Sequence, residues 1–166
     1  MMRKKPMLAY PVSDKPIDYT KPVFMQPKLD GVRCLIQQEF HKDGDKVVAY
    51  SRTGKKWLNI DHILQSLKPF FAGNPDVILD GELYNHALRD DFEKIISCVR
   101  KQKPTAIDRA ESRKLVQFHC YDIVEESVEF KYRNQWLQTF LNPTYGIKLV
   151  KTTHIKYEFD ANSFHQ

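Results

Sequence analysis

The sequence holds few cysteines, and none of them is near another. Its 166 residues include Cys34, Cys98 and Cys120, which are far apart and odd in number. None belongs to a C-x-x-C pair, so the sequence favours neither a zinc site nor a disulfide framework. Isolated cysteines fit a reducing compartment, and we expect a cytoplasmic protein.

Other signatures are also missing. No apolar run approaches the roughly 20 residues of a transmembrane helix. The first residues, MMRKKPMLAYP, carry basic side chains but no apolar core of a signal peptide. No G-x-x-x-x-G-K-[ST] pattern occurs, which disfavours a P-loop kinase. We therefore expect no membrane partner.

The composition is that of a basic globular domain. Hydrophobic residues make up 42% and aromatic residues 12%, and the formal net charge is +5. A basic balance favours partners that carry phosphates, such as nucleic acid. The simpler interpretation is that lysine and arginine side chains form an ordinary solvated surface.

Hydrophobic periodicity predicts strands and helices in an α+β order. A hairpin is predicted from a strand over 24–40, the Asp43-Gly44 turn and a strand over 47–52. Further strands are predicted over 76–84, 114–124 and 147–155. Helices are predicted over 59–70, 90–101 and 131–141, with Asp90 and Glu93 forming a capping box at the second. These elements predict mostly antiparallel sheets flanked by helices.

The two ends of the chain differ from this pattern. The first 22 residues contain four prolines and little periodicity, which predicts an extended lead-in. The main domain is then expected over 23–166. The last residues resemble the beginning of another helix, with Asp160 or Asn162 as its cap. A domain rarely ends by opening a helix, so we expect a C-terminally truncated chain.

The stretch QPKLDGVR raises the question of function. It places Lys28 in a predicted apolar strand, two residues before the Asp30-Gly31 turn, with Arg33 two residues beyond the glycine. Gly31 permits a close approach of backbone to a ligand. A lysine attacks only when deprotonated, so partial burial and nearby cations would have to lower the pKa of Lys28. The pattern predicts a nucleophilic lysine with phosphate-binding help, or else an ordinary hairpin with both side chains in water.

A second stretch, SRTGK, adds more positive charge near Arg33. It closes the predicted hairpin, so Arg52 projects near Arg33, and Lys55 follows the turn at Gly54. Converging cations of this kind form a cradle for phosphate. Taken alone, the stretch is equally typical of a basic surface turn.

Two further stretches carry acidic and aromatic side chains. In ILDGELY, Asp80 and Glu82 share one face of a strand unless Gly81 introduces a bulge. Such carboxylates hold Mg²⁺ or sugar hydroxyls, or simply end a solvated strand. In FHCYDIV, Tyr121 is expected to lie in the core or to present its ring to a base.

These stretches, in this order, resemble the ATP-dependent DNA ligases of the covalent nucleotidyltransferase superfamily. KLDGVR matches the family's nucleotidyl-lysine motif, and SRTGK, DGELY and FHCYDI resemble the motifs that follow it. DDFEKIISCVRK resembles a helix of small phage-type and viral ligases, and KYRNQWL the family's arginine-bearing helix. The resemblance covers about residues 5 to 160. It implies an adenylation domain with ATP and Mg²⁺ as cofactors, acting in DNA repair or replication in a bacterium or a phage-infected cell.

The resemblance also implies roles for individual residues. Lys28 would attack the α-phosphate of ATP and carry AMP. Arg33 would contact the nucleotide or the 5′-phosphate of a nick, and Arg52 would bind phosphate. The remaining assignments are Glu82 to the ribose, Tyr121 to stacking on adenine, Gln26 to the adenine edge, and Asp30, Gly31, Lys55 and Asp80 to supporting positions. No residue is assigned to a metal.

The family's pattern is incomplete in this sequence. A later glutamate-containing strand (E-G-x-x-x-K-like), a lysine pair (K-x-K-like) and an OB-fold domain are absent, so we expect the front part of an adenylation domain. That part would adenylate poorly or not at all, and its exposed sheet edge would favour dimers. The expected partner is nicked double-stranded DNA.

Other functions stay open on the sequence. An RNA ligase or a capping guanylyltransferase shares the lysine motif. A non-catalytic basic module would bind nucleic acid with a steep salt dependence and tolerate loss of Lys28. A metal-dependent phosphodiesterase built on Asp76, Asp80 and Glu82 would need no nucleotide.

Overall fold

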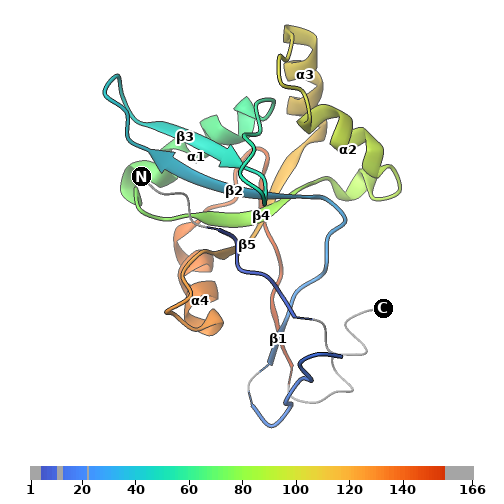
Figure 1. The fold of residues 1–166 in the computed structure, drawn as a ribbon, viewed down its shortest axis with the longest axis vertical. Helices are drawn as coiled ribbons and strands as arrows, with labels where there is room; N and C mark the ends of the chain where they lie inside the picture. Colours follow the sequence, from blue (N-terminus) through green and yellow to red (C-terminus); the bar gives the residue numbers. More distant parts are fainter. Residues whose placement is uncertain (1–4, 11–12, 22, 156–166) are drawn as a thin grey trace.

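The computed structural model describes residues 5–10, 13–21 and 23–155. Figure 1 shows the order of its elements along the chain. They are β1 (Val23–Met25), β2 (Val32–Glu39), β3 (Lys46–Tyr50), α1 (Asp61–Gly73), β4 (Leu79–Tyr84), the 3₁₀ helix η1 (His86–Leu88), α2 (Phe92–Val99), α3 (Ala106–Leu115), β5 (Gln117–Ile123), α4 (Phe130–Phe140), β6 (Ile147–Leu149) and β7 (Thr153–Ile155).

The strands form two sheets. The larger has the order β3-β2-β4-β5-β6, in which all neighbours are antiparallel except β5 and β6. The smaller pairs β1 with β7 in antiparallel fashion, and it lies below the larger sheet in Figure 1. The predicted α+β class and its mostly antiparallel sheets are confirmed.

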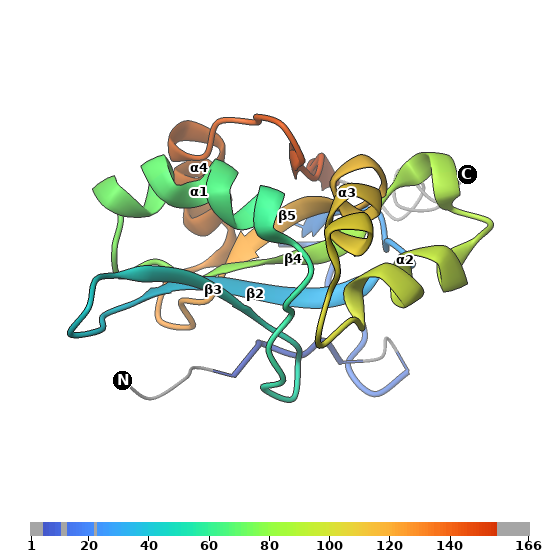
Figure 2. The ribbon, with the colours of Figure 1, turned by 90° about the horizontal axis from the view of Figure 1, so that it is seen from above.

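The two faces of the larger sheet have different environments. Helices α1, α3 and α4 lie over one face in Figure 2, and the segment from the N-terminus passes along the other. Cys34, Ile36, Leu79 and Leu83 alternate toward the helices and form the main core with them. The opposite face has a smaller cluster of Leu35, Ile78 and Val124. This second face therefore has room for polar side chains.

A β-bulge in β5 breaks the regular alternation. Asp80 pairs with Asp122 and Gly81 with Cys120, so Tyr121 has no partner on β4. Phe118 and Cys120 face the core before this point. Bulges redirect side chains, and this one lies beside the residues singled out from the sequence.

The strand predicted over 24–40 is interrupted. β1 ends at Met25 and β2 begins at Val32, and the segment 26–31, here called the lysine loop, crosses from one sheet to the other. Pro27 lacks the N–H that a continuous ladder would need. The strand predicted over 147–155 divides in the same way, into β6 and β7 on different sheets. Both predictions were wrong because alternation does not show which sheet a segment joins.

The helix predictions were confirmed for α1, α2 and α4, with corrections at the ends. α1 continues past Pro69 to Gly73, and Phe71 at its end is fully buried. α2 begins after Asp91, whose side chain makes no capping hydrogen bond, so the predicted capping box at Asp90 was wrong.

Helix α3 was not predicted. Its side chains are mostly polar, with Ser112 buried, so it lacks the apolar stripe that signals a helix. Its capping box, formed by Thr105 and Asp108, was the available signal. The strand predicted from residue 114 begins only at Gln117, because Lys114 and Leu115 complete α3.

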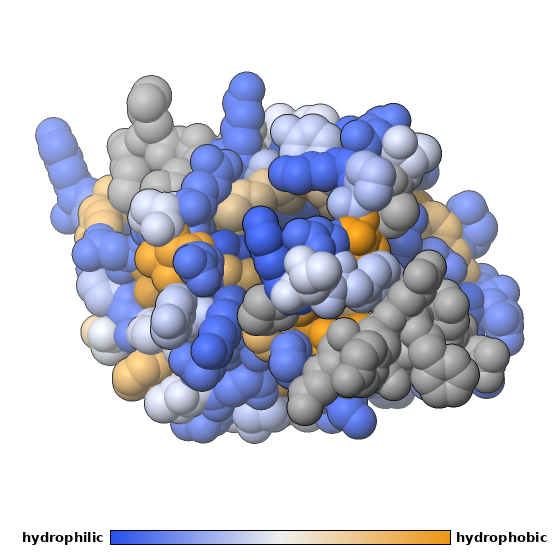
Figure 3. Space-filling view, turned by 90° about the horizontal axis from the view of Figure 1, so that it is seen from below, coloured by the Kyte–Doolittle hydropathy of each residue, from blue (hydrophilic) through white to orange (hydrophobic). Residues whose placement is uncertain are grey.

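The ends and the surface add little to the architecture. Residues 5–10 and 13–21 contain turns but no helix or strand, and the helix predicted from 156 onward lies outside the described residues. None of the described helices is both long and apolar enough to cross a bilayer. The three cysteines are buried and unpaired. Figure 3 shows a largely hydrophilic surface, with small separate apolar patches, at the end of the molecule that lies lowest in Figure 1.

Two glycines allow a direct test of the packing between β4 and β5. A Cβ at Gly81 would lie 2.4 Å from the carbonyl oxygen of His119, whereas one at Gly73 would meet nothing within 4 Å. We expect Gly81→Ala to lower the free energy of unfolding by about 1–3 kcal/mol, as overpacking does. Gly73→Ala should be neutral or stabilise by up to about 1 kcal/mol. Urea unfolding of both variants measures this, and equal stabilities would contradict the close strand packing.

Candidate active site

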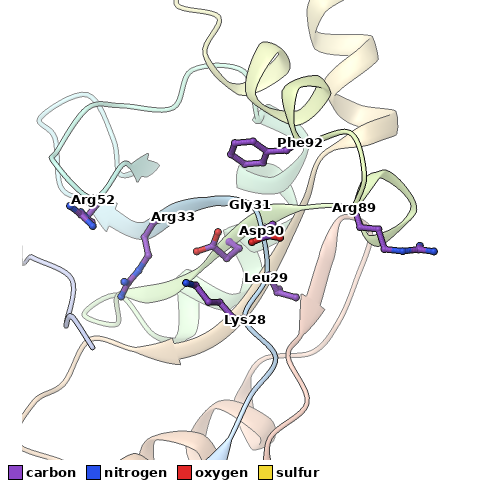
Figure 4. A pocket seen from close by; sticks show the side chains of 9 residues that line it. Lys28, Leu29, Asp30, Gly31, Arg33, Arg52, Arg89 and Phe92 are labelled. Atoms are coloured by element: carbon purple, nitrogen blue, oxygen red, sulfur yellow. The ribbon is translucent and has the colours of Figure 1, made fainter. Parts of the chain in front are cut away.

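A pocket of about 540 Å³ opens beside the lysine loop. It lies between that loop, strands β2 and β4, the turn after β3 and the beginning of α2. Figure 4 shows the side chains that line it, which are Lys28, Leu29, Asp30, Gly31, Arg33, Arg52, Glu82, Arg89 and Phe92. We call it the lysine pocket.

The structure brings most of the predicted site residues to this one pocket. Six of them line it: Lys28, Asp30, Gly31, Arg33, Arg52 and Glu82. They come from three of the four stretches that the sequence singled out. Four do not belong to its wall: Gln26, Lys55, Asp80 and Tyr121.

Lys28 is exposed, which corrects the prediction of a partly buried lysine in a strand. It lies in the middle of the lysine loop, and that loop belongs to neither sheet. Figure 4 shows its side chain projecting to the same side as Arg33 and Arg52, whereas Arg89 projects away. The amine is therefore exposed to water, on the wall of a pocket that two of these arginines, Arg33 and Arg52, also line.

Arg33 forms an ion pair with a buried carboxylate. Its Nε lies 2.8 Å from Oδ1 of Asp80 and its Nη2 lies 2.5 Å from Oδ2, and the Asp80 side chain is only 1% exposed. Burial raises the pKa of the Asp80 carboxyl, and the ion pair with Arg33 opposes that rise. Nη2 also donates to the carbonyl oxygen of Met7, at 2.9 Å. Asp80 thus supports the site by holding Arg33 in place.

Glu82 lies directly across from Arg33 in the pairing of β2 with β4. Burial raises the pKa of its carboxyl to about 7, although Arg33 and a backbone hydrogen bond from Gly31 oppose this. The hydroxyl of Tyr121 lies 3.4 Å from its Oε1. Near neutral pH this carboxyl therefore exchanges a proton, and it can accept from or donate to a sugar hydroxyl.

Tyr121 lies behind the pocket wall. Its side chain lies on the face of the sheet opposite to that of Cys120 and approaches Glu82, while the guanidinium of Arg33 lies 5.7 Å from its ring centroid. Burial raises the pKa of its hydroxyl, which therefore stays protonated. One face of the ring is thus already in contact with Arg33.

Gln26 and Lys55 hold the backbone near the pocket. The side-chain amide of Gln26 donates to the carbonyl oxygen of Tyr121 and to the hydroxyl of Thr152, each at 2.9 Å. Lys55 closes the turn that begins at Ser51, through a backbone hydrogen bond of 2.7 Å and another to the Ser51 hydroxyl of 3.0 Å. That turn presents Arg52 to the pocket.

Two residues of the pocket wall were missed as site residues. Phe92 is the first residue of α2 and is 37% exposed. Arg89 follows η1 and donates to the carbonyl oxygen of His86 at 3.1 Å. Neither lies in a stretch with a site-like pattern, so the sequence offered no signal for them.

A metal site built by the protein alone would need several histidine, cysteine or acidic side chains close together. Within the described ranges, no group of three or more histidine, cysteine or acidic side chains is arranged to hold an ion. Nucleotide-bound Mg²⁺ needs only one or two carboxylates, because phosphates and water supply the remaining ligands. Asp30 is an exposed carboxylate on the pocket wall and fits that limited role. Asp80 does not, because it is buried and already forms an ion pair with Arg33.

Arg33 and Arg52, two of the three arginines that line the pocket, should differ in their effect on stability. Replacing Arg33 with methionine leaves Asp80 buried without its partner, so we expect Arg33→Met to lower the free energy of unfolding by about 3–5 kcal/mol. Arg52 is exposed, so the matched change Arg52→Met should alter it by no more than about 0.5 kcal/mol. Denaturant unfolding compares them. An equally mild effect of both changes would contradict the ion pair.

Glu82 should make stability depend on pH in a defined direction. Its pKa is about 7 in the fold against an ordinary value of 4.5, so between these values the folded protein binds a proton that the unfolded chain releases. The contribution of Glu82 to the free energy of unfolding is fully present below about pH 4.5 and is lost as the pH rises through about 7. His119, whose pKa burial lowers to about 4, acts in the opposite direction.

The Glu82→Gln variant separates these two effects. It retains His119 but has no group that titrates at position 82. We expect the free energy of unfolding of Glu82→Gln, minus that of the unchanged protein, to increase from about pH 5 to about pH 8. Urea titrations at several pH values measure this difference, and a flat difference would contradict a raised pKa at Glu82.

Comparisons with known proteins agree with this geometry. The family model described as the ATP dependent DNA ligase domain matches residues 6–166. The DNA ligase of African swine fever virus (isolate Pig/Kenya/KEN-50/1950) is 34% identical over 106 residues, which cover 63% of this chain and 22% of that protein.

Solved structures show the same fold. One, titled "DNA binding with a minimal scaffold: Structure-function analysis of Lig E DNA ligases", has a TM-score of 0.65 and 20% identity, covering 98% of this chain and 56% of that one. Another, "Pmar-Lig_PreS3", has a TM-score of 0.63 and 19% identity, covering 89% and 34%. The chain spans less than two thirds of each of these relatives. It belongs to the family of ATP-dependent DNA ligase domains.

Proposed function

We propose that this chain carries the adenylation site of an ATP-dependent DNA ligase, with Lys28 as the nucleophile. The observation that supports this most directly is the lysine pocket. Its lining gathers an exposed amine, three guanidinium groups and two carboxyls from segments far apart in the chain. An amine beside cations is suited to attack on a phosphate, because the cations stabilise the negative charge of the transition state.

In the first step, the deprotonated Nζ of Lys28 attacks the α-phosphorus of ATP. The N–P bond forms, the bond to the β-phosphate oxygen breaks, and pyrophosphate leaves with that electron pair. Arg52 is exposed and binds phosphate oxygens, while the part of the Arg33 guanidinium not held by Asp80 contacts the nucleotide. Glu82 holds the ribose, and Tyr121 supports it from behind. Asp30 would hold a nucleotide-bound Mg²⁺, which would supply neutralisation of charge on the pyrophosphate.

The partner of the loaded enzyme is nicked double-stranded DNA. AMP passes from Lys28 to the 5′-phosphate of the nick, and the neighbouring 3′-hydroxyl then attacks that phosphate and releases AMP. The net charge of +5 favours such a polyanion. We place this activity in DNA repair or replication in the cytoplasm of a bacterium or of a phage-infected cell.

We expect the first step to be slow in this chain. Arg33 is largely neutralised by Asp80, and Arg89 projects away from Lys28. Arg52 is then the main cation of the described pocket that is available to the α-phosphate. Lack of charge neutralisation raises the barrier to phosphoryl transfer.

Intact-mass spectrometry after long incubation with ATP and Mg²⁺ tests the proposal. We expect an AMP adduct that forms with ATP and is absent in Lys28→Ala. Lys42→Ala, which removes an exposed lysine of the β2–β3 turn outside the pocket, is the matched control and should keep the adduct.

The other outcomes point elsewhere. A preference for GTP would indicate a capping guanylyltransferase instead. An adduct that persists in Lys28→Ala, or no adduct in the unchanged protein even at saturating ATP, would contradict the proposed role of Lys28.

A further inference from the structure

The lysine loop is held at both ends. At its far end, a Cβ on Gly31 would lie 2.4 Å from the carbonyl oxygen of Leu83 and 3.1 Å from a carboxylate oxygen of Glu82. The backbone there is in direct contact with β4. At its near end, Gln26 is tied by its side chain. Lys28 lies between these two anchors.

The Gln26 anchor is a chain of hydrogen bonds across three separate elements. Nε2 of Gln26 donates to the carbonyl oxygen of Tyr121 on β5 and to Oγ1 of Thr152, which lies just before β7, each at 2.9 Å. Oγ1 of Thr152 in turn donates to Oδ1 of Asn134 on α4, at 3.1 Å. The bonds to Tyr121 and Thr152 span 95 and 126 residues of sequence, so they are long-range tertiary contacts.

The order of donors and acceptors makes Asn134 part of the anchor. A hydroxyl has one proton to donate and lone pairs that accept. Because the Thr152 proton is directed at Asn134, a lone pair of its oxygen is left for the Gln26 amide. Hydrogen bonds linked in this way polarise one another and restrict each other's geometry. The Tyr121 carbonyl is available because the bulge leaves that residue without a partner on β4.

Pro27 connects the anchor rigidly to the lysine. Its ring fixes its own φ near −65°, and it restricts Gln26, the residue before it, to extended conformations. A displacement of Gln26 therefore displaces the backbone of Lys28 by a similar amount. Neither Thr152 nor Asn134 lines the lysine pocket, so they cannot act by touching a bound nucleotide there.

We propose that Thr152 and Asn134 are positioning residues for Lys28, which hold the Gln26 amide and so fix the lysine loop for attack. Gln26 then acts mainly as the link between this pair and the lysine, rather than through its amide at the adenine edge. The catalytic consequence rests on the proposed function, since a correctly placed amine matters only if Lys28 is the nucleophile. Such positioning lowers the barrier by holding reacting atoms in line.

Hydrogen exchange tests the anchor itself. Thr152→Val removes the hydroxyl at nearly constant volume, and Asn134→Ala removes its acceptor. We expect amides of residues 28–31 to exchange about five-fold faster in both variants, the factor that corresponds to one hydrogen bond of about 1 kcal/mol. Amides of the core strand β4 serve as an internal reference for global stability. Thr152→Ser, which keeps the hydroxyl, should restore slow exchange.

Thr153→Val is the matched control. It makes the same chemical change one residue further on, in β7, at a half-buried position outside the hydrogen-bond chain. It should leave the exchange of residues 28–31 unchanged. Equal exchange in Thr152→Val and the unchanged protein, or an equal increase in Thr153→Val, would overturn the proposal.

Kinetics of adduct formation test the catalytic consequence. We expect Thr152→Val to lower the adenylation rate at saturating ATP about five-fold and to leave the ATP concentration for half-maximal rate unchanged, because the pocket wall is intact. A loss confined to ATP affinity would overturn the proposal. Failure of the unchanged protein to form an adduct would refute the proposed function. The exchange measurements, and acetylation of Lys28 by acetic anhydride, need no adduct, so they would still decide whether the anchor holds the loop.

Discussion

A carboxylate that is almost completely buried, Asp80, requires a partner, and the site is organised around the arginine that supplies it. Burying an unpaired charge costs several kcal/mol or more, so Arg33 and Asp80 stay together. Their bidentate contact joins β2 to β4 on the face of the sheet that the helices leave uncovered. With Arg33 fixed, Glu82 lies opposite it and Tyr121 lies beneath it.

Tyr121, at the bulge in β5, serves this arrangement in two ways. Its side chain approaches Glu82, and its carbonyl oxygen accepts a hydrogen bond from Gln26, since the bulge leaves the residue without a partner on β4. The same residue thus supports the pocket from behind and holds the beginning of the lysine loop. Glycines at 31 and 81 allow the backbone contacts on either side, since a Cβ at each would overlap a neighbouring carbonyl oxygen.

Local pattern predicted much of the fold and only part of the site. The hairpin of β2 and β3 followed from alternation and from the Asp43-Gly44 turn, and the motif stretches correctly indicated that Lys28, Arg33, Arg52 and Glu82 would meet. Alternation could not show that the chain leaves one sheet at Met25 and enters another at Val32. For this reason the predicted burial of Lys28 was wrong.

Long-range contacts account for most of what the sequence did not reveal. Asn134 lies in a predicted helix and Thr152 in a predicted strand, but nothing local marks either as a partner of Gln26, and only the fold brings them to it. Phe92 was missed because periodicity cannot separate a buried face from a pocket wall at the first turn of a helix. Helix α3 was missed because its face is polar, although its capping box was present in the sequence.

A crystal structure of this chain with a non-hydrolysable ATP analogue would decide whether Lys28 is the nucleophile. We predict the nucleotide in the lysine pocket, with its α-phosphorus about 3–3.5 Å from Nζ of Lys28, its ribose at Glu82 and its phosphates near Arg52. A nucleotide bound instead in the groove between α4 and the ends of β4 and β5, with Lys28 still in water, would contradict it.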